Sequence, residues 1–171
     1  ADAKGLLAAA LADPNPVLYF EHKGLYRSLS GDVPAGYYET PMGKAAIARE
    51  GNDLSIITYG MGVHWAMKAV AELGVDAEIV DLRSLAPLDY AAIAATVKKT
   101  SRALILHEAS LTGGLGGELA AWIGEHCFED LDAPVRRLAA LDTPVPFAAA
   151  LEADYLPANR LSASINALLK Y

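Results

Sequence analysis

Residues 54–62 decide the fold, because an apolar run passes directly into a glycine turn: Leu54-Ser55-Ile56-Ile57-Thr58-Tyr59-Gly60-Met61-Gly62. A continuous run of this kind is typical of a strand that is buried on both faces of a parallel sheet. The glycines lead into a helical pattern that Gly74 ends, with apolar positions at Trp65, Met67, Val70 and Leu73. A strand that passes straight into a helix predicts a crossover unit of an α/β protein.

The same alternation continues to the carboxyl end of the chain. Further strands are expected at residues 78–82, 103–106 and 135–138. A helix is expected to begin after Asp89, because aspartate is a preferred N-cap residue. Further helices are expected at residues 113–128, 147–155 and 161–169. Residues 45–49 predict a first strand, and the turn at residues 50–53 indicates that this strand runs antiparallel to the next. We therefore predict a three-layer αβα domain with a five-stranded, mostly parallel sheet and one antiparallel edge strand.

The chain before residue 44 follows a different pattern. Residues 3–12 predict a short apolar helix that the prolines in residues 13–16 end. Residues 17–20 form a run of β-formers, as expected for a buried parallel strand, and residues 24–43 are rich in glycine and show no periodicity. We expect residues 1–23 to end one domain, residues 24–43 to be a linker, and residues 44–171 to form the next domain.

Composition limits the possible functions. The 171 residues are 53% hydrophobic and carry a net charge of -7, so the chain can bury a core but lacks the clustered cations of a nucleic-acid binder. Cys127 is the single cysteine, which excludes an internal disulfide and fits a reducing cytoplasm. No apolar run approaches the ~20 residues of a membrane span, and the first helix lacks the basic region of a signal peptide.

The glycines at residues 113–117 are the first candidate site. They follow a strand and open a helix, where backbone N–H groups can hold a phosphate. They match neither the dinucleotide fingerprint nor the P-loop. Close backbone packing is the favoured interpretation, because a glycine cluster at such a turn mainly serves the backbone. The same holds for the shorter turn at Gly60 and Gly62.

Histidines are the second kind of candidate. His107 and Glu108 are adjacent, but neighbours in a strand point to opposite faces, so a structural histidine is favoured over an acid–base pair. His22 lies near the end of the first expected strand and has no identifiable partner. No metalloenzyme spacing and no nucleophile elbow occurs. The residues alone therefore give an α/β domain without a convincing catalytic set.

An ordered series of motifs suggests a family. The series resembles the carboxy-terminal part of the β subunits of thiamine-diphosphate-dependent 2-oxo acid dehydrogenases over nearly the whole chain. The branched-chain (2-oxoisovalerate) type is more similar than the pyruvate type, on His107-Glu108-Ala109, Thr112-Gly113-Gly114 and the terminal tyrosine. The matching stretches are residues 15–23, 25–27, 41–45, 49–53, 81–89, 97–100, 107–109, 112–114, 132–134 and 142–144.

The resemblance implies an activity for the whole enzyme. That enzyme decarboxylates a 2-oxo acid on thiamine diphosphate and passes the acyl group to a lipoyl arm of an acyltransferase. The family's catalytic residues lie in the preceding pyrimidine-binding domain, whose last helix and strand residues 1–23 resemble, and its diphosphate and magnesium are held by the α half. The resemblance therefore places no catalytic or cofactor-binding residue in this chain. It implies assembly with an α half, separate or fused, and with a second β half.

Two kinds of site residue follow from the resemblance. Ala10, Asp13 and Asn15 match the family's potassium-binding turn, where free carbonyls at a helix end suit a hard cation. Asp132 and Tyr171 match positions that dock the subunit-binding domain of the acyltransferase. Ordinary helix termination and a solvated turn are the alternative interpretations of these positions.

Two other functions stay open from the sequence. The chain could be a stand-alone module of the same fold that holds a small anion at residues 113–117. It could also belong to another enzyme of the superfamily, such as a pyruvate dehydrogenase β subunit. On the main interpretation, the isolated chain is inactive.

Overall fold

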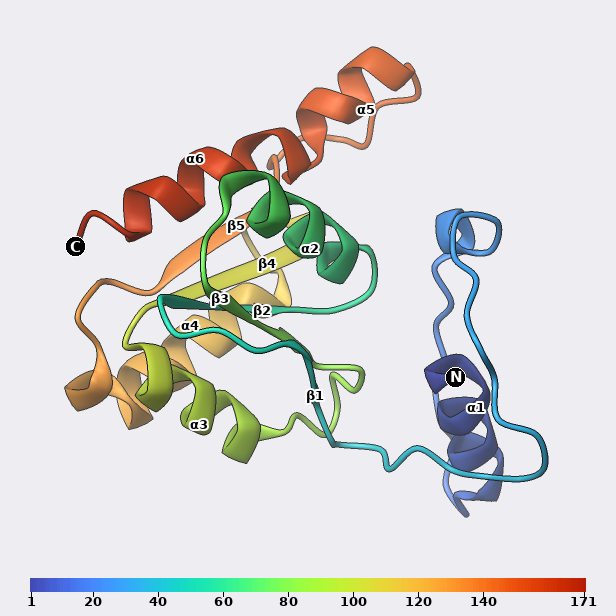
Figure 1. Ribbon diagram of the computed structural model, residues 1–171. Coiled ribbons are helices and arrows are strands. Elements are labelled where there is room, and N and C mark those ends of the chain that lie inside the picture. Colours follow the sequence, from blue (N-terminus) through green and yellow to red (C-terminus); the bar gives the residue numbers. More distant parts are fainter.

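The computed structural model describes residues 1–171 and has one five-stranded sheet. The strand order is β1-β3-β2-β4-β5 (Figure 1). Four strands are parallel, and β1 pairs antiparallel with β3 at one edge, as the sequence predicts. The strands are β1 (Ala46–Arg49), β2 (Leu54–Thr58), β3 (Ala77–Asp81), β4 (Ala103–Ser110) and β5 (Arg136–Ala140).

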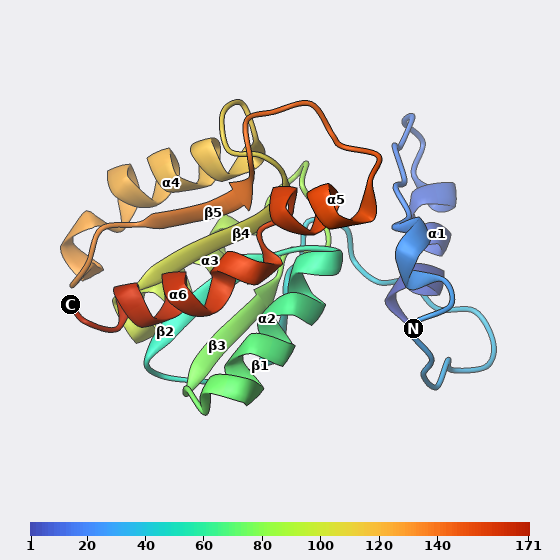
Figure 2. The same cartoon turned by 90° about the horizontal axis from the view of Figure 1, so that it is seen from above.

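Helices cover both faces of the sheet and confirm the three-layer prediction (Figure 2). Helices α2 (Met61–Leu73) and α6 (Ala158–Leu168) pack on one face, and α3 (Tyr90–Thr100) and α4 (Leu115–His126) pack on the other. The short helices η2 (Phe128–Asp130) and α5 (Ala149–Tyr155) complete the domain. None of the helices combines the length and apolar character that crossing a bilayer requires.

The central strand explains why its sequence is apolar throughout. Ile56 belongs to the cluster under α2 and α6, whereas Ile57 belongs to the cluster under α3 and α4. Successive strand residues point to opposite faces, so a strand that is covered on both sides buries every side chain. Burying one isoleucine contributes about 1.5–3 kcal/mol relative to leaving it exposed.

Residues 1–43, the amino-terminal unit, lie beside this domain (Figure 1). Helix α1 (Asp2–Ala12) ends at Asp13, as predicted, and one 3-10 turn, η1 (Lys23–Leu25), interrupts the irregular chain that follows. The prediction of a buried strand at residues 17–20 is wrong. These residues do not form a strand, and Leu18 and Phe20 are 84% and 86% exposed. A strand needs a neighbour for its backbone hydrogen bonds, and no other strand pairs with this segment.

Two details of the main sheet differ from the sequence prediction. The strand expected at residues 103–106 extends to Ser110 and therefore includes His107 and Glu108. The chain does reverse direction after β1, but β3 and not β2 is the neighbour of β1. After β2 the chain passes through α2 and returns as β3, which pairs with β2. β3 therefore occupies the position between β1 and β2.

Candidate functional site at the carboxyl edge of the sheet

The carboxyl ends of β2 and β4 mark the place where this fold can hold a functional site. The crossover after β2 leads to β3 on one side, and the next crossover leads to β4 on the other side. Ligands of open α/β sheets bind at such a switch point. Tyr59 follows β2, Asp81 ends β3 and Glu108 lies near the end of β4, so this edge carries several titratable groups.

Glu108 pairs with a histidine from the amino-terminal unit. His22 Nε2 lies 3.0 Å from Glu108 Oε2 and 3.3 Å from Oε1. As predicted, His107 and Glu108 point to opposite sides: the His107 side chain is fully buried, and Glu108 is partly exposed. Sequence reasoning found no partner for His22, because the pair is 86 positions apart and only the folded chain brings it together.

The geometry of His22 does not suit acid–base catalysis. Its Nε2 is engaged by Glu108, and its Nδ1 is buried without a hydrogen-bond partner while the ring lies against Gly24. Burial and the charge of Glu108 raise the pKa of Tyr59, so its phenol stays protonated at neutral pH. The Nε2 of His22 is therefore already engaged, and the Tyr59 phenol does not offer a base at neutral pH.

Arg83 makes a second connection at this edge. Its guanidinium donates hydrogen bonds to the carbonyls of Lys44 and Ala45, at 3.1 Å each, and lies 3.4 Å from the carboxylate of Asp2 in α1. The amide of Arg83 donates to Asp81, whose pKa burial raises. The loop after β3, part of the 81–89 motif, thus holds both the entry to β1 and the start of α1.

The glycine turn before α4 is filled by protein. A Cβ atom on Gly114 would lie 2.6 Å from His107 Cε1, and one on Gly116 would lie 2.7 Å from His107 Cδ2. The ring donates from Nδ1 to the carbonyl of Ala109 at 3.1 Å, and burial lowers its pKa, so the ring is neutral. Close packing on the His107 ring accounts for the glycines at positions 114 and 116, in line with the packing interpretation of this turn.

Asp142 joins the loops that follow β4 and β5. Its carboxylate accepts hydrogen bonds from the amide of Thr112 at 2.9 Å and from the hydroxyl of Thr112 at 2.6 Å. These two bonds, the hydroxyl first, lower the pKa of Asp142. The two motifs that contain Thr112 and Asp142 therefore stabilise one local structure at the carboxyl edge.

The residues matched to a potassium site lie together at the end of α1. Asp13 caps the helix, and its Oδ1 accepts hydrogen bonds from the amide of Asn15 at 2.8 Å and from its side chain at 3.0 Å. Pro14 has no N–H, so the carbonyl of Ala10 lacks its usual helical partner four residues on. No group of three or more His, Cys, Asp or Glu side chains could hold a metal ion.

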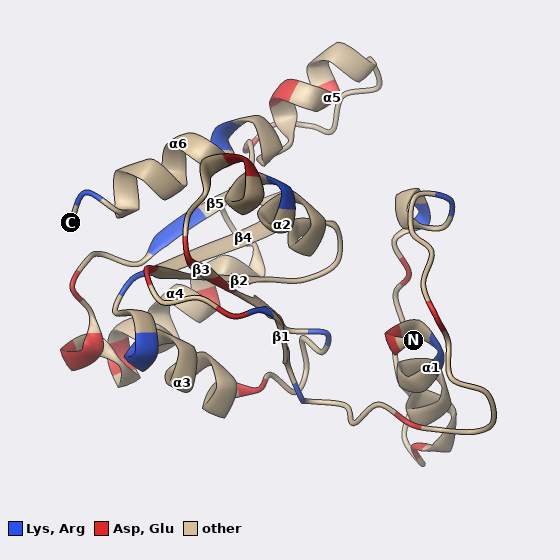
Figure 3. Cartoon of the chain, viewed as in Figure 1, with Lys and Arg blue, Asp and Glu red and all other residues tan.

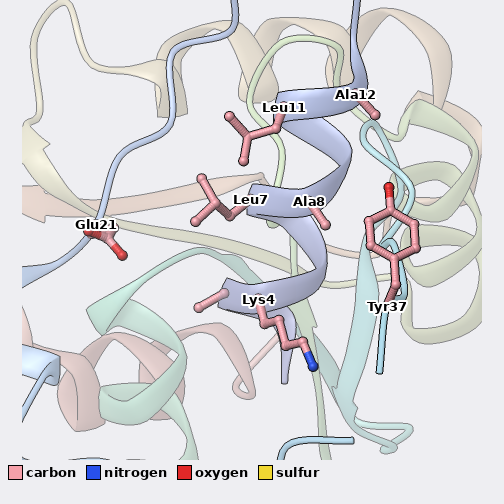
Figure 4. Close-up of a pocket in the computed structure, with 8 residues that line it drawn as sticks. Lys4, Leu7, Ala8, Leu11, Ala12, Glu21 and Tyr37 are labelled. Atoms are coloured by element: carbon pink, nitrogen blue, oxygen red, sulfur yellow. The ribbon is translucent and has the colours of Figure 1, made fainter. Parts of the chain in front are cut away.

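The two docking candidates share one pocket. Asp132 and Tyr171 line a cavity of about 480 Å³ between α4, the start of β5 and the end of the chain, and Phe128, Leu131 and Val135 are among its apolar walls. A second cavity of about 670 Å³ runs along α1, where Leu7 and Leu11 point to the same side (Figure 4).

Comparisons with known proteins agree on one family. The family model described as "Transketolase, C-terminal domain" matches residues 43–160. The chain is 48% identical over 159 residues to the 2-oxoisovalerate dehydrogenase subunit beta of Bacillus subtilis, covering 91% of this chain and 49% of the relative. It is 46% identical over 163 residues to the same subunit of Pseudomonas aeruginosa, covering 86% of this chain and 47% of that relative.

Two further matches bear on substrate and assembly. The pyruvate dehydrogenase E1 component subunit beta of Bacillus subtilis is also 48% identical over 159 residues, with 91% of this chain and 49% of the relative covered. A split gene transketolase, described as an inactive beta4 tetramer, matches with a TM-score of 0.67 and 26% identity over 77% of this chain and 44% of that one. The chain spans about half the length of the curated relatives it matches.

The glycine turn generates a prediction with an internal control. Gly116→Ala forces a methyl group into the buried His107 ring, so it should lower the free energy of unfolding by about 1–3 kcal/mol. Gly117→Ala, one residue on, meets only the end of the Arg137 side chain at 3.5 Å and should be neutral or stabilise by up to about 1 kcal/mol. Urea unfolding of both variants tests this, and equal effects would contradict it.

The lowered pKa of Asp142 predicts a pH dependence. A carboxylate whose pKa is lower in the folded protein adds stability above its ordinary pKa, and this part is lost as the pH falls through the folded value. The difference in melting temperature between the unsubstituted chain and Asp142→Asn should therefore be constant above about pH 5 and shrink below about pH 4. Thr112→Val, which removes the hydroxyl donor, should weaken this dependence. A difference that stays the same down to about pH 2 would exclude the role of Asp142.

Proposed function

The chain belongs to the transketolase C-terminal domain family, and from this premise we propose that it is the carboxy-terminal assembly and docking domain of a 2-oxo acid dehydrogenase β half. One observation carries the proposal: the chain is nearly half identical to dehydrogenase β subunits, and at the carboxyl edge of its sheet His22 is engaged by Glu108 and His107 is buried. The whole enzyme would oxidatively decarboxylate branched-chain 2-oxo acids and transfer the acyl group to lipoyl groups. A pyruvate dehydrogenase β subunit is the second candidate, since one such relative is equally identical.

The proposed cofactors are thiamine diphosphate and magnesium, held outside this chain. When bound, thiamine diphosphate supplies the electron sink for decarboxylation. The glycine turns of this chain do not offer it an open phosphate site, because the His107 ring packs against the turn before α4 and Thr58 packs against Gly62 in the turn before α2. We therefore assign this chain no step of the chemistry.

The proposed domain boundaries follow from exposure in the amino-terminal unit. Leu11, Leu18 and Phe20 are each at least 80% exposed, and the cavity along α1 has apolar walls. We assign residues 1–23 to the end of a pyrimidine-binding domain, whose remaining part would cover these side chains, residues 24–43 to a linker, and residues 44–171 to the transketolase-like domain. The relatives, about twice as long as this chain, support the assignment.

Asp132 and Tyr171 are the proposed contacts for the acyltransferase's subunit-binding domain. The pocket that they share offers apolar walls to an anchoring side chain. Glu129 and Asp130 in η2 add negative charge at this end of the domain (Figure 3). An acidic rim around an apolar pocket fits a partner that combines basic residues with an apolar anchor.

A second surface suits subunit assembly. Val145, Phe147 and Leu151 are 66%, 106% and 60% exposed in the segment that leads into α5 and in α5 itself. Several large exposed apolar side chains in one segment are typical of an interface. We assign this surface to contact with a second β half or with the α half. The β4 tetramer described for a transketolase of this fold supports self-association.

A cytoplasmic location is part of the proposal. Similar subunits occur in the bacterium Bacillus subtilis and, as mitochondrial proteins by name, in Dictyostelium discoideum. A bacterial protein of this kind would work in the cytoplasm. Fractionation of the source cells tests the location, and recovery with the membrane or the cell exterior would contradict it.

Activity and docking can be tested together. The parent β half with its α half should decarboxylate 2-oxoisovalerate with a dye as acceptor, and the isolated chain should not. Asp132→Asn or deletion of Tyr171 should weaken calorimetric binding of the subunit-binding domain about tenfold, while Glu72→Gln on the distant α2 should not. Turnover by the chain alone would overturn the proposal, and a preference for pyruvate would favour the second candidate.

The free carbonyl of Ala10 supports a potassium site with Asp13 and Asn15. In the parent protein, KCl should raise the melting temperature by about 2 °C over NaCl at equal ionic strength. Asp13→Ala should abolish the difference, and Asp32→Ala in the exposed linker should keep it. Equal melting temperatures in both salts would exclude the site.

A further inference from the structure

We propose that the carboxyl edge of the sheet is the surface on which the amino-terminal unit docks, here called the seat. Glu108 and Arg83 are the two side chains of the domain that anchor the unit there. In open α/β sheets this edge usually holds a small ligand. Here two of its charged side chains, Glu108 and Arg83, are directed at residues 1–43 of the same chain. The proposal goes beyond the function above, because it assigns a role to the edge that needs neither cofactor nor partner.

Glu108 is placed for this role by the end of β4. Its neighbour His107 is fully buried under the glycine turn, so alternation along the strand turns Glu108 to the open side. There its carboxylate meets His22 at 3.0 Å, and the two side chains are 39% and 30% exposed. Gly24 lies against the His22 ring and, at 3.8 Å, a Cβ atom on it would reach Met61 at the start of α2. The end of the amino-terminal unit thus contacts the switch point itself.

Arg83 anchors the opposite end of the same unit. Its side chain is 14% exposed and is fixed by the carbonyls of Lys44 and Ala45, so its guanidinium is held in place before it meets Asp2. Asp2 lies in the first turn of α1, whereas His22 follows α1 by ten residues. Two anchors far apart in the unit resist both translation and rotation on the edge, which a single contact cannot do.

Docking of the amino-terminal unit on the seat is expected to be reversible, because the two ion pairs that hold it are weak. Partly exposed ion pairs change an equilibrium by about fivefold at most, and salt screens them. The chain runs directly from the unit into the domain at residue 44, which keeps the unit close after either contact breaks, so each contact re-forms readily. Loss of both anchors should therefore release the unit while the domain itself stays folded on its two hydrophobic clusters.

Distances between spin labels test the seat in the full chain. Labels at Ala12→Cys in α1 and Glu72→Cys in α2 report the position of the unit on the domain, and Cys127 is buried with a raised pKa and so reacts slowly. The unsubstituted chain should give one narrow distance distribution. Asp2→Ala combined with Glu108→Ala should broaden it and raise the ratio of displaced to seated chains by up to about 25-fold, about fivefold for each pair, and 1 M NaCl should act in the same direction.

Control variants separate the seat from general damage. Glu118→Ala removes an exposed carboxylate of α4 away from the seat and should leave the distribution narrow. Glu108→Gln keeps a hydrogen-bond partner for His22 and should broaden the distribution less than Glu108→Ala. The melting temperature of the domain should change little in all of them. A distribution that stays narrow in the double variant, or is already broad in the unsubstituted chain, overturns the seat whatever the enzyme's activity proves to be.

Discussion

Burial of β2 on both faces is the constraint on which the remaining structure depends. Leu54 and Ile56 must be covered by α2 and α6, and Ile57 must be covered by the helices on the other side. Consecutive strands of a parallel sheet usually pair with a strand that is near in sequence. The crossover after β2 places β3 on one side of it, and the crossover after β3 places β4 on the other side. The switch point at the carboxyl edge is therefore a consequence of burying the central strand, and not a feature added for function.

What occupies that edge determines what the domain can do. The turn before α4 uses glycine because the backbone passes directly over the His107 ring. This ring is neutral and fully buried, so it serves the packing of the turn. On the outer side, Glu108 faces a histidine whose two nitrogens are both sequestered. The edge is thus closed from within by the core and from outside by the chain's own amino-terminal unit.

Local patterns predicted the elements of this fold, and distant contacts escaped them. The helix start at Asp89 is marked by a local hydrogen bond from the Ala92 amide at 3.2 Å, and the helix end at Gly74 is marked by its positive φ. The length of β4 was missed because its last residues are polar and gain order from β5 and the glycine turn. The false strand at residues 17–20 shows the converse: β-forming residues do not make a strand without a partner. The pairing of His22 with Glu108 depends on the position of a whole unit, which no local pattern contains.

The titratable groups with shifted pKa values serve the structure of this domain. An enzyme site keeps a titratable group poised, buried and open to its substrate. In this chain, the buried groups with shifted pKa values either stay neutral, as His107 and Tyr59 do, or serve structure, as Asp81 does by accepting the Arg83 amide. The exposed carboxylate of Asp142 holds two loops together. On the function proposed above, the reactive groups lie in another domain, and this domain holds that domain and the partners in a fixed relative position.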